Sequence, residues 1–427
     1  MTGRGRYPSA MRRRPRSKAL AVMAGVVVAS TAVVVGIWAF PGTRVSLRGG
    51  PRYRVSRIRD TLALSCPRPA NCFALVGPGV THQGDGPGTL AFTADDGRHW
   101  SVRSLPPVFQ FGASRLVCPT LEHCIVTADV PSQSTSAVVP ATAFGVTWDA
   151  GATWTEVSPQ GTTYVLSALS CGDEVHCVAT GFVGQPAVTP PSNASAYFGL
   201  TLVYMSTGDG GLHWRAVKSN LPFTAPYSES DCPSSTTCWI VETPSGYEDY
   251  VPTQTILVRT TDGGRSWQTV TARVPGLPAS SGIDCLGDSF CIVGGGWQQA
   301  VIATTRDAGA GWRTVTNLPR TNAPGASNEC PKGQLCSRVT PIEGVYCVTS
   351  RHCWATATVN FWTMPSSPHP RAATELLKSR DGGASWAIAS ILSHDDEHVA
   401  IGRSSCWASA CMSTGFNGST QIITLSS

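Results

Sequence analysis

Residues 260–267 read TTDGGRSW, and this octapeptide is one of six related copies in the chain. The others are TADDGRHW at 93–100, TWDAGATW at 147–154, TGDGGLHW at 207–214, TRDAGAGW at 305–312 and SRDGGASW at 379–386. An aspartate carboxylate accepts hydrogen bonds from backbone N–H groups of its own turn, and a glycine supplies the positive φ that a tight turn requires. The pattern therefore predicts hairpin turns that each end in a tryptophan packed over the edge of a sheet.

Sixteen cysteines form a second repeated pattern, and they fall into eight close pairs. The pairs are Cys66/Cys72, Cys118/Cys124, Cys171/Cys177, Cys232/Cys238, Cys285/Cys291, Cys330/Cys336, Cys347/Cys353 and Cys406/Cys411. Zinc sites favour two to four intervening residues with histidines at defined offsets, whereas most of these pairs enclose five residues. We therefore expect local disulfides and an oxidising compartment.

The period of the cysteine pairs points to the fold. Without Cys330/Cys336, the first cysteines stand at positions 66, 118, 171, 232, 285, 347 and 406. Steps of about 50 to 60 residues are typical of propellers and solenoids. Short β-rich stretches flank each cysteine turn, as in LALSC and CFALV at 62–76, and predict hairpins. The sequence thus predicts an all-β, seven-bladed β-propeller over residues 51–427.

A propeller blade has four strands, which divides each repeat. The cysteine hairpin supplies the two inner strands, and the stretches before and after the octapeptide supply the two outer ones. After Cys411 the chain has room for only one further strand, so we expect PRYRVSRI at 51–58 to complete the last blade and remove its exposed edge. The cysteine turns and octapeptides then share one face. The long connections 129–143, 181–199, 242–253, 317–342 and 357–372 share the other, with 317–342 as an ordered insertion that contains Cys330/Cys336.

The octapeptide resembles the Asp-box, or bacterial neuraminidase repeat, of sialidase-like propellers. With the cysteine hairpins, the resemblance covers nearly all of residues 55–427. In that family the box is structural and remote from the active site, so the resemblance implies a structural role for its aspartates and tryptophans. These are Asp95, Trp100, Asp149, Trp154, Asp209, Trp214, Asp262, Trp267, Asp307, Trp312, Asp381 and Trp386. The competing interpretation, catalytic acids or calcium ligands, fails because six copies on separate blades cannot converge on one substrate.

Sialidases are the enzymes whose turn motif this octapeptide resembles. They use an arginine triad, a Tyr/Glu nucleophile pair and an Asp acid, and so differ from glycosidases that use two carboxylates. This sequence lacks their Phe/Tyr-Arg-Ile-Pro motif and offers only Arg115 and Arg403 as inward-facing arginines. Seven-bladed propellers with similar boxes include the photosystem II stability factor family, and this resemblance implies a role as an assembly scaffold. We therefore expect a binding or assembly scaffold without cofactor or metal. A sialidase-like glycoside hydrolase or a glycan-binding lectin is the alternative.

Binding usually resides in variable loops over a repetitive scaffold, and its energy concentrates in aromatic residues and arginines. The candidate contacts are Arg115, Tyr197, Tyr247, Glu248, Tyr250, Trp297, Trp362, Arg371 and Arg403, and the expected partner is an extracytoplasmic protein or glycan. Polar residues before each first cysteine, among them Asp231 and Asp284, predict a polar central channel. The run His394–His398 could bind a divalent metal, but a solvated loop is the simpler interpretation.

The first forty residues predict a membrane anchor. Seven basic residues precede an uncharged run, Ala19–Phe40, and account for the whole formal net charge of +5, which therefore does not indicate a nucleic-acid partner. As a helix this run would span about 33 Å at roughly 1.5 Å per residue, enough to cross a hydrocarbon core of about 30 Å. We expect a cytoplasmic segment 1–18, a transmembrane signal-anchor helix 19–40, a linker 41–50 and an extracytoplasmic propeller. A cleaved signal peptide is the alternative.

Overall fold

A computed structural model describes the strand-forming part of the chain. It covers residues 53–56, 61–77, 88–109, 113–130, 141–157, 163–183, 201–221, 228–243, 255–270, 274, 276–277, 280–296, 299–319, 335–363, 371–393, 400–407, 410–416 and 420–426. The predicted cytoplasmic segment, transmembrane helix and linker lie outside these residues. Within the described ranges, none of the helical structure has the length and apolar character needed to span a bilayer.

The described residues form 28 strands and one short 3-10 turn, η1 (Pro107–Phe109). Three of the sheets are β2 (Thr61–Arg68), β3 (Asn71–Val76), β4 (Thr89–Thr93), β5 (Ser101–Ser104); β14 (Ser228–Asp231), β15 (Cys238–Glu242), β16 (Ile256–Thr260), β17 (Gln268–Thr269); and β18 (Ser280–Leu286), β19 (Phe290–Gly296), β20 (Ala300–Thr305), β21 (Arg313–Val315). A fourth is β22 (Leu335–Cys347), β23 (Cys353–Thr363), β24 (Arg371–Ser379), β25 (Ala387–Ser393). The inner strand pairs of these sheets are antiparallel.

The other two sheets depart from this simple order. One has eight strands: β6 (Ala113–Val117), β7 (Cys124–Val130), β8 (Ala141–Thr147), β9 (Thr155–Val157), β10 (Thr163–Cys171), β11 (Cys177–Val183), β12 (Thr201–Thr207) and β13 (Arg215–Lys218). The other contains β26 (Ala400–Trp407), β27 (Ala410–Phe416), β28 (Thr420–Ser426) and, from the opposite end of the chain, β1 (Tyr53–Ser56). β1 pairs with β28 in the register Tyr53 to Leu425, the closure expected from the strand count.

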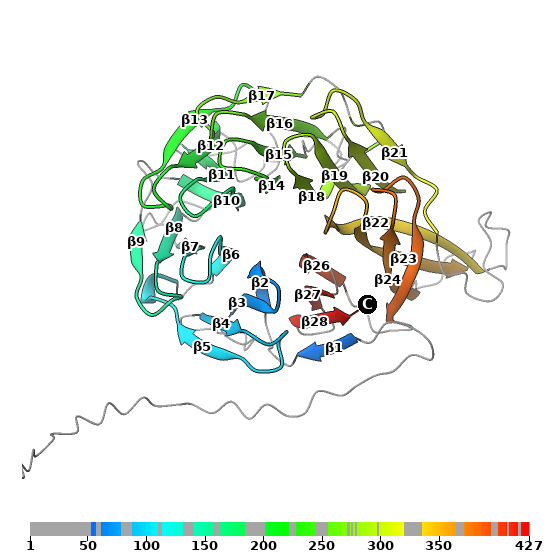
Figure 1. Ribbon diagram of the computed structural model, residues 1–427, viewed down its shortest axis with the longest axis horizontal. Coiled ribbons are helices and arrows are strands. Elements are labelled where there is room, and N and C mark those ends of the chain that lie inside the picture. Colours follow the sequence, from blue (N-terminus) through cyan, green and yellow to red (C-terminus); the bar gives the residue numbers. More distant parts are fainter. Residues whose placement is uncertain are drawn as a thin grey trace, which may run out of the picture. The chain divides into compact units, whose positions relative to one another are not determined.

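The innermost strands follow one another around a central axis, as Figure 1 shows. β2, β6, β10, β14, β18, β22 and β26 each contact the next, and β26 contacts β2. The all-β propeller is therefore confirmed. The prediction of seven separate blades is corrected, because the described strands make six sheets: Tyr164 of β10 pairs with Ala141 of β8, which joins two four-strand repeats into one sheet.

The hydrophobic core lies between neighbouring sheets. Phe73 and Leu75 of β3 pack with Val126 of β7, and Ile302 of β20 packs with Ile342 of β22, all of them fully buried. Burying one such side chain contributes about 1.5–3 kcal/mol. Because each cluster draws residues from two repeats, each repeat needs its neighbour in order to bury its apolar face.

Six of the eight cysteine pairs form disulfides in the described residues, and each closes the turn between the two inner strands of a repeat. The pairs are Cys66–Cys72, Cys118–Cys124, Cys171–Cys177, Cys232–Cys238, Cys285–Cys291 and Cys347–Cys353, with Cα–Cα distances of 3.9–4.1 Å. Local cross-strand disulfides are thus confirmed for these six pairs. Cys406 and Cys411 face each other across β26 and β27.

These disulfides are also part of the core, which the cysteine spacing did not indicate. Cys72 is fully buried and packs with Leu64 of β2 and with Met412 of β27. Cys291 is fully buried as well and packs with Trp239 of β15, in the neighbouring sheet. The second cysteine of these hairpins therefore lies at the start of an inward strand rather than at an exposed turn, and its sulfur contributes apolar surface between repeats.

The remaining pair, Cys330/Cys336, is described only in part, and the insertion expected at 317–342 stays a prediction. Cys336 lies in β22, where it pairs with Trp362 of β23, and so belongs to a regular strand rather than to a loop. The reason is that antiparallel pairing between the two strands continues outward as far as Leu335 and Thr363. Cys330 lies outside the described residues, and its disulfide with Cys336 stays a prediction.

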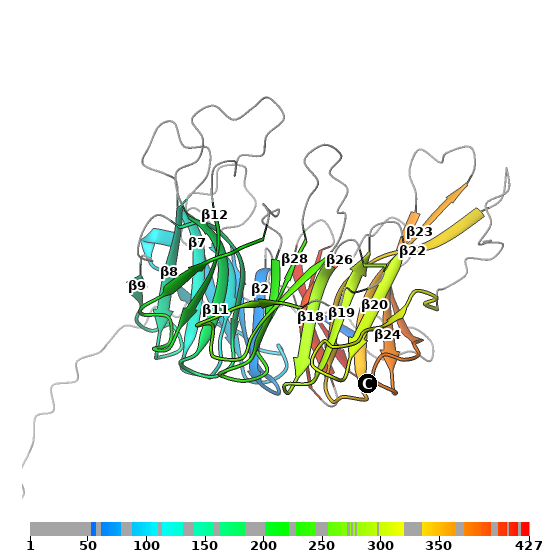
Figure 2. The same ribbon diagram turned by 90° about the horizontal axis from the view of Figure 1, so that it is seen from above.

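The other connections on this face are also shorter than the sequence suggested. β7 continues to Val130, β11 to Val183 and β23 to Thr363, each within a range expected to be a connection. β22 and β23 reach beyond the neighbouring strands on this side (Figure 2). The strands therefore extend farther toward this face than the expected connection boundaries indicated.

Candidate functional site

The six octapeptides fold into one repeated turn geometry. The first hydroxyl donates to Oδ1 of the aspartate at 2.8–2.9 Å in every copy. The same Oδ1 accepts the backbone N–H four residues later at 2.8–2.9 Å. The N–H of the fourth residue donates to a carbonyl of the cysteine turn, as from Ala150 to Glu122 at 2.8 Å. Cysteine turns and octapeptides therefore share one face, as expected.

These hydrogen bonds lower the pKa values of the octapeptide aspartates. The backbone N–H and the hydroxyl of Thr153 hold the pKa of Asp149 at about 2, and the hydroxyl of Ser385 does the same for Asp381. Trp100, Trp214 and Trp386 donate from Nε1 to a glycine carbonyl three residues earlier. A carboxyl group whose pKa is about 2 is deprotonated at neutral pH and has no proton to donate, so the geometry suits turn formation rather than acid catalysis.

Residues directly before the first cysteines link neighbouring repeats around the axis. The N–H of Cys285 donates to Asp231 Oδ2 at 2.6 Å, and the N–H of Cys347 donates to Asp284 Oδ2, also at 2.6 Å. Ser65 Oγ accepts the N–H of Cys118 in the same way at 2.9 Å. Each bond joins one innermost strand to the next, so these side chains hold the ring of strands together.

The two axial aspartates also interact with each other electrostatically. Burial raises the pKa of Asp231 to about 6, although two backbone N–H groups oppose the shift. Burial and the charge of Asp231 raise the pKa of Asp284 to about 8. The pair therefore carries about one negative charge at neutral pH, shared as in other coupled carboxyl pairs.

A chain of polar side chains crosses three repeats near the same axis. Arg115 Nη2 donates to the carbonyl of Ser167 at 2.7 Å, and Ser167 Oγ donates to Ser228 Oγ at 3.1 Å. Ser228 Oγ donates to Glu242 Oε2 at 2.6 Å. Ser167 Oγ also bonds Thr180 Oγ1 at 2.8 Å. The predicted polar interior is therefore confirmed here, and these side chains bond one another and the backbone of the next repeat.

A tyrosine and a glutamate lie near each other in this region, at positions that the sequence did not suggest. Tyr204 is 3% exposed and Glu242 is fully buried. Burial and the charge of Glu242 raise the pKa of Tyr204, whose hydroxyl accepts a bond from Ser219 Oγ at 3.2 Å. A serine four residues before the first cysteine, as at Ser114, Ser167 and Ser228, was the available signal for this polar layer.

Of the predicted contact residues, only Arg115 has a described side chain. Trp362 and Arg371 lie on adjoining strands, since Arg371 of β24 pairs with Phe361 of β23, and Arg403 lies in β26. Five of the predicted contacts lie outside the described residues: Tyr197, Tyr247, Glu248, Tyr250 and Trp297. The run His394–His398, which follows β25, also lies outside them. The structure thus brings Trp362 and Arg371 together at the level of the backbone.

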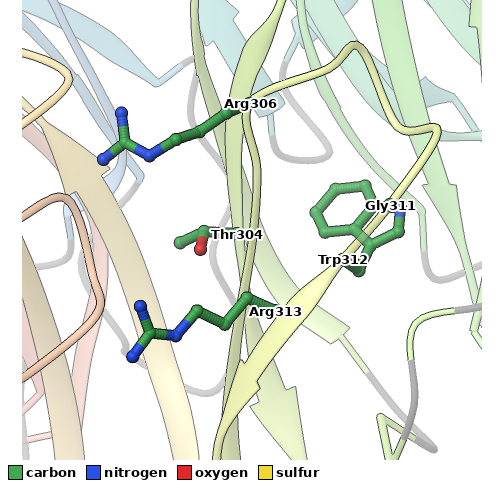
Figure 3. Close-up of a pocket in the computed structure, with 5 residues that line it drawn as sticks. All are labelled: Thr304, Arg306, Gly311, Trp312 and Arg313. Atoms are coloured by element: carbon green, nitrogen blue, oxygen red, sulfur yellow. The ribbon is translucent and has the colours of Figure 1, made fainter.

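One groove opens beside β20 and β21, with a volume of about 400 Å³. It is lined by Thr304, Arg306, Gly311, Trp312 and Arg313 (Figure 3). Within the described ranges, no group of three or more histidine, cysteine or acidic residues is placed to hold a metal ion. The charged side chains that line the groove are those of Arg306 and Arg313.

Comparisons with known proteins bear on the fold alone. No protein-family model matches the chain, and no curated protein matches its sequence. An ulvan lyase of polysaccharide lyase family PL25 is 9% identical, with a TM-score of 0.52 over 90% of this chain and 96% of the lyase. YCF48 from Cyanidioschyzon merolae is 11% identical, with a TM-score of 0.48 over 91% of this chain and 99% of YCF48. The sialidase of Trypanosoma rangeli is 11% identical, with a TM-score of 0.42 over 85% of this chain and 59% of the sialidase. The likeness to the ulvan lyase shows a shared fold and does not establish a shared activity, because one fold can host different functions.

Proposed function

We propose that this chain is a membrane-anchored, extracytoplasmic β-propeller that serves as a binding or assembly scaffold. The observation that carries the proposal is the engagement of the ionisable residues around the axis. Asp231 and Asp284 accept backbone N–H groups of the next repeat, and Arg115 donates to the carbonyl of Ser167. An enzyme needs groups that face the substrate and change their bonding in the transition state. Groups committed to backbone bonds between repeats serve the fold instead.

The face that carries the long connections is the proposed binding surface. The strand ends Val130, Val183, Glu242 and Thr363 lie opposite the cysteine turns, and each leads into one of these connections. A rigid ring that presents loops of differing length is a common way to build a recognition surface. We assign Tyr197, Tyr247, Tyr250, Trp297, Trp362 and Arg371 as contacts of an extracytoplasmic protein or glycan partner.

The proposal includes two finer assignments. The six octapeptide turns are Asp boxes, supported by their shared hydrogen-bond geometry. Residues 19–40 form an uncleaved signal anchor, supported by the basic segment before them and by disulfides, which persist outside the cytoplasm. Protease added to intact cells should then digest the propeller. Digestion that occurs only after lysis would contradict this topology.

The experiment that tests the binding role uses the full chain in its own cell envelope. Tyr247→Ala, Tyr250→Ala and Trp297→Ala should each weaken capture of the partner by crosslinking while leaving the melting temperature unchanged. Asp149→Ala, which removes turn bonds on the opposite face, is the matched control and should lower the melting temperature first. If loop variants and wild type capture the same material equally, the binding face is assigned wrongly. Binding of purified glycans by the full chain would indicate the lectin alternative.

A further inference from the structure

Two arginines line the groove beside β20 and β21, and neither forms an ion pair with a described residue. In Figure 3 the guanidinium groups of Arg306 and Arg313 point to the same side of the strands, with the Thr304 side chain between them. Arg313 lies opposite Thr304 in the β20–β21 pair. The groove lies near the octapeptide turn, opposite the long connections, so it is independent of the binding face proposed above.

Arg306 is held in place by the neighbouring repeat. Its Nη2 donates to the carbonyl of Ser350 at 3.0 Å and to that of Asp381 at 3.3 Å. Its guanidinium carbon lies 5.0 Å from the centroid of the Phe290 ring. These contacts fix the planar donor group, and they leave Nη1 and Nε without a hydrogen bond to any described residue. A fixed guanidinium loses little conformational entropy when it binds a ligand.

Arg313 contributes a second positive charge and forms no ion pair with a described residue. Its side chain is exposed, and the ion pairs between described residues are three histidine–aspartate pairs elsewhere. The nearest carboxylates, Asp307 and Asp381, are ionised, but their oxygens accept hydrogen bonds within their own turns, from Thr305 and Gly311 and from Ser379 and Ser385. The groove therefore presents two guanidinium groups and one hydroxyl, and neither arginine forms an ion pair with a described carboxylate.

We propose that this groove binds a sulfate or phosphate group, with Arg306 and Arg313 supplying charge-assisted hydrogen bonds and Thr304 a neutral one. The guanidinium fork matches two oxygens of such an ion at once, and paired arginines are the usual protein solution for it. A volume of about 400 Å³ accommodates the ion together with part of the molecule that carries it. The ligand is the free ion or an ester on a polysaccharide, and the two share this chemistry.

Calorimetric titration of the full chain in detergent with inorganic sulfate and inorganic phosphate at low ionic strength tests the site. Arg313→Gln should weaken binding about ten-fold or more, because it removes a charged donor of hydrogen bonds to the anion. Thr304→Val should weaken binding less. Because Arg313 is exposed, its substitution should leave the melting temperature unchanged.

The chain provides a matched control in Arg215. This residue follows its octapeptide tryptophan just as Arg313 does and lies opposite Ser206 in the β12–β13 pair, but position 208 is a glycine where the other repeat has Arg306. Arg215→Gln should leave binding unchanged. If the wild type shows no saturable binding, or if both glutamine variants lose affinity equally, the groove is not a site. Competition by dextran sulfate that depends on Arg313 identifies a polymer ester as the ligand, whereas binding of the inorganic ions without such competition identifies the free ion.

Discussion

The axial aspartate pair makes the stability of this propeller fall as the pH rises. The informative change is Asp284→Asn, because the amide oxygen still accepts the N–H of Cys347 but the side chain cannot ionise. The pKa of Asp284 is raised from 3.8 to about 8 in the folded chain. The folded state therefore holds a proton that the unfolded chain releases. This contribution to the free energy of unfolding is complete below about pH 4 and is lost as the pH rises through 8.

The size of the effect follows from the shift. One pKa unit corresponds to about 1.4 kcal/mol, so the raised pKa sets a ceiling of about 4 kcal/mol on the loss between pH 5 and pH 9. Part of the shift comes from the charge of Asp231, and we therefore expect about 2–4 kcal/mol for the single substitution. Relative to wild type, Asp284→Asn should gain stability by this amount as the pH rises.

Urea unfolding between pH 5 and pH 9, without reductant, measures this difference. The turn aspartates do not interfere, because their pKa values are lowered and their stabilisation is lost only when the pH falls below about 4. The matched control is Asp288→Asn, an exposed carboxylate in the turn that follows β18, which should keep the pH dependence of wild type. If Asp284→Asn and wild type run parallel from pH 5 to pH 9, the coupling between the axial aspartates is wrong.

Three further predictions concern the scaffold. Asp149→Ala should lower the urea midpoint, because the N–H of Thr153 and the Thr147 hydroxyl lose their acceptor; an unchanged midpoint would contradict the role of the turn. Gly211→Ala should cost about 1–3 kcal/mol in the same assay, since φ is +94° and the added Cβ would lie 2.8 Å from Ile125 Cδ1. Gly276, with φ +72° and nothing near the added Cβ, should tolerate alanine better. Deletion of residues 53–56 should expose the edge of β28 and cause concentration-dependent aggregation in light scattering, whereas a stable monomer would argue against the closure.

The repeats made the fold predictable, and pairings across repeats limited the prediction. The spacing of Cys171 and Cys177 fixes a hairpin, and the octapeptide fixes the next turn, so the four strands of a repeat follow from local sequence. The single pair of Tyr164 with Ala141 joins strands of two different repeats, and no local pattern encodes such a pairing. Six sheets therefore replaced the seven blades expected. Cys336 was also misplaced by local sequence. Its close spacing to Cys330 suggested a loop, but it pairs with Trp362 and is part of a strand.

The candidate site was predictable only in kind. Polar residues before each cysteine indicated a polar axis, and Asp231 and Asp284 were among them. Their bonds to the N–H groups of Cys285 and Cys347 join residues more than 50 positions apart in sequence. The groove has the same limitation, because Arg306 is positioned by carbonyls of Ser350 and Asp381 in the next repeat. Register between repeats, rather than composition, decides which side chains meet.

The most direct test of the scaffold account is turnover of sialosides, a broad glycoside panel and acidic polysaccharides by the purified full chain, with the melting temperature followed in parallel. A scaffold without catalysis should show no turnover, and Arg115→Gln and Glu242→Leu should lower the melting temperature because each removes a partner from the buried chain through Ser167 and Ser228. Turnover by wild type that either substitution abolishes, with the melting temperature unchanged, would contradict the account and make these residues catalytic.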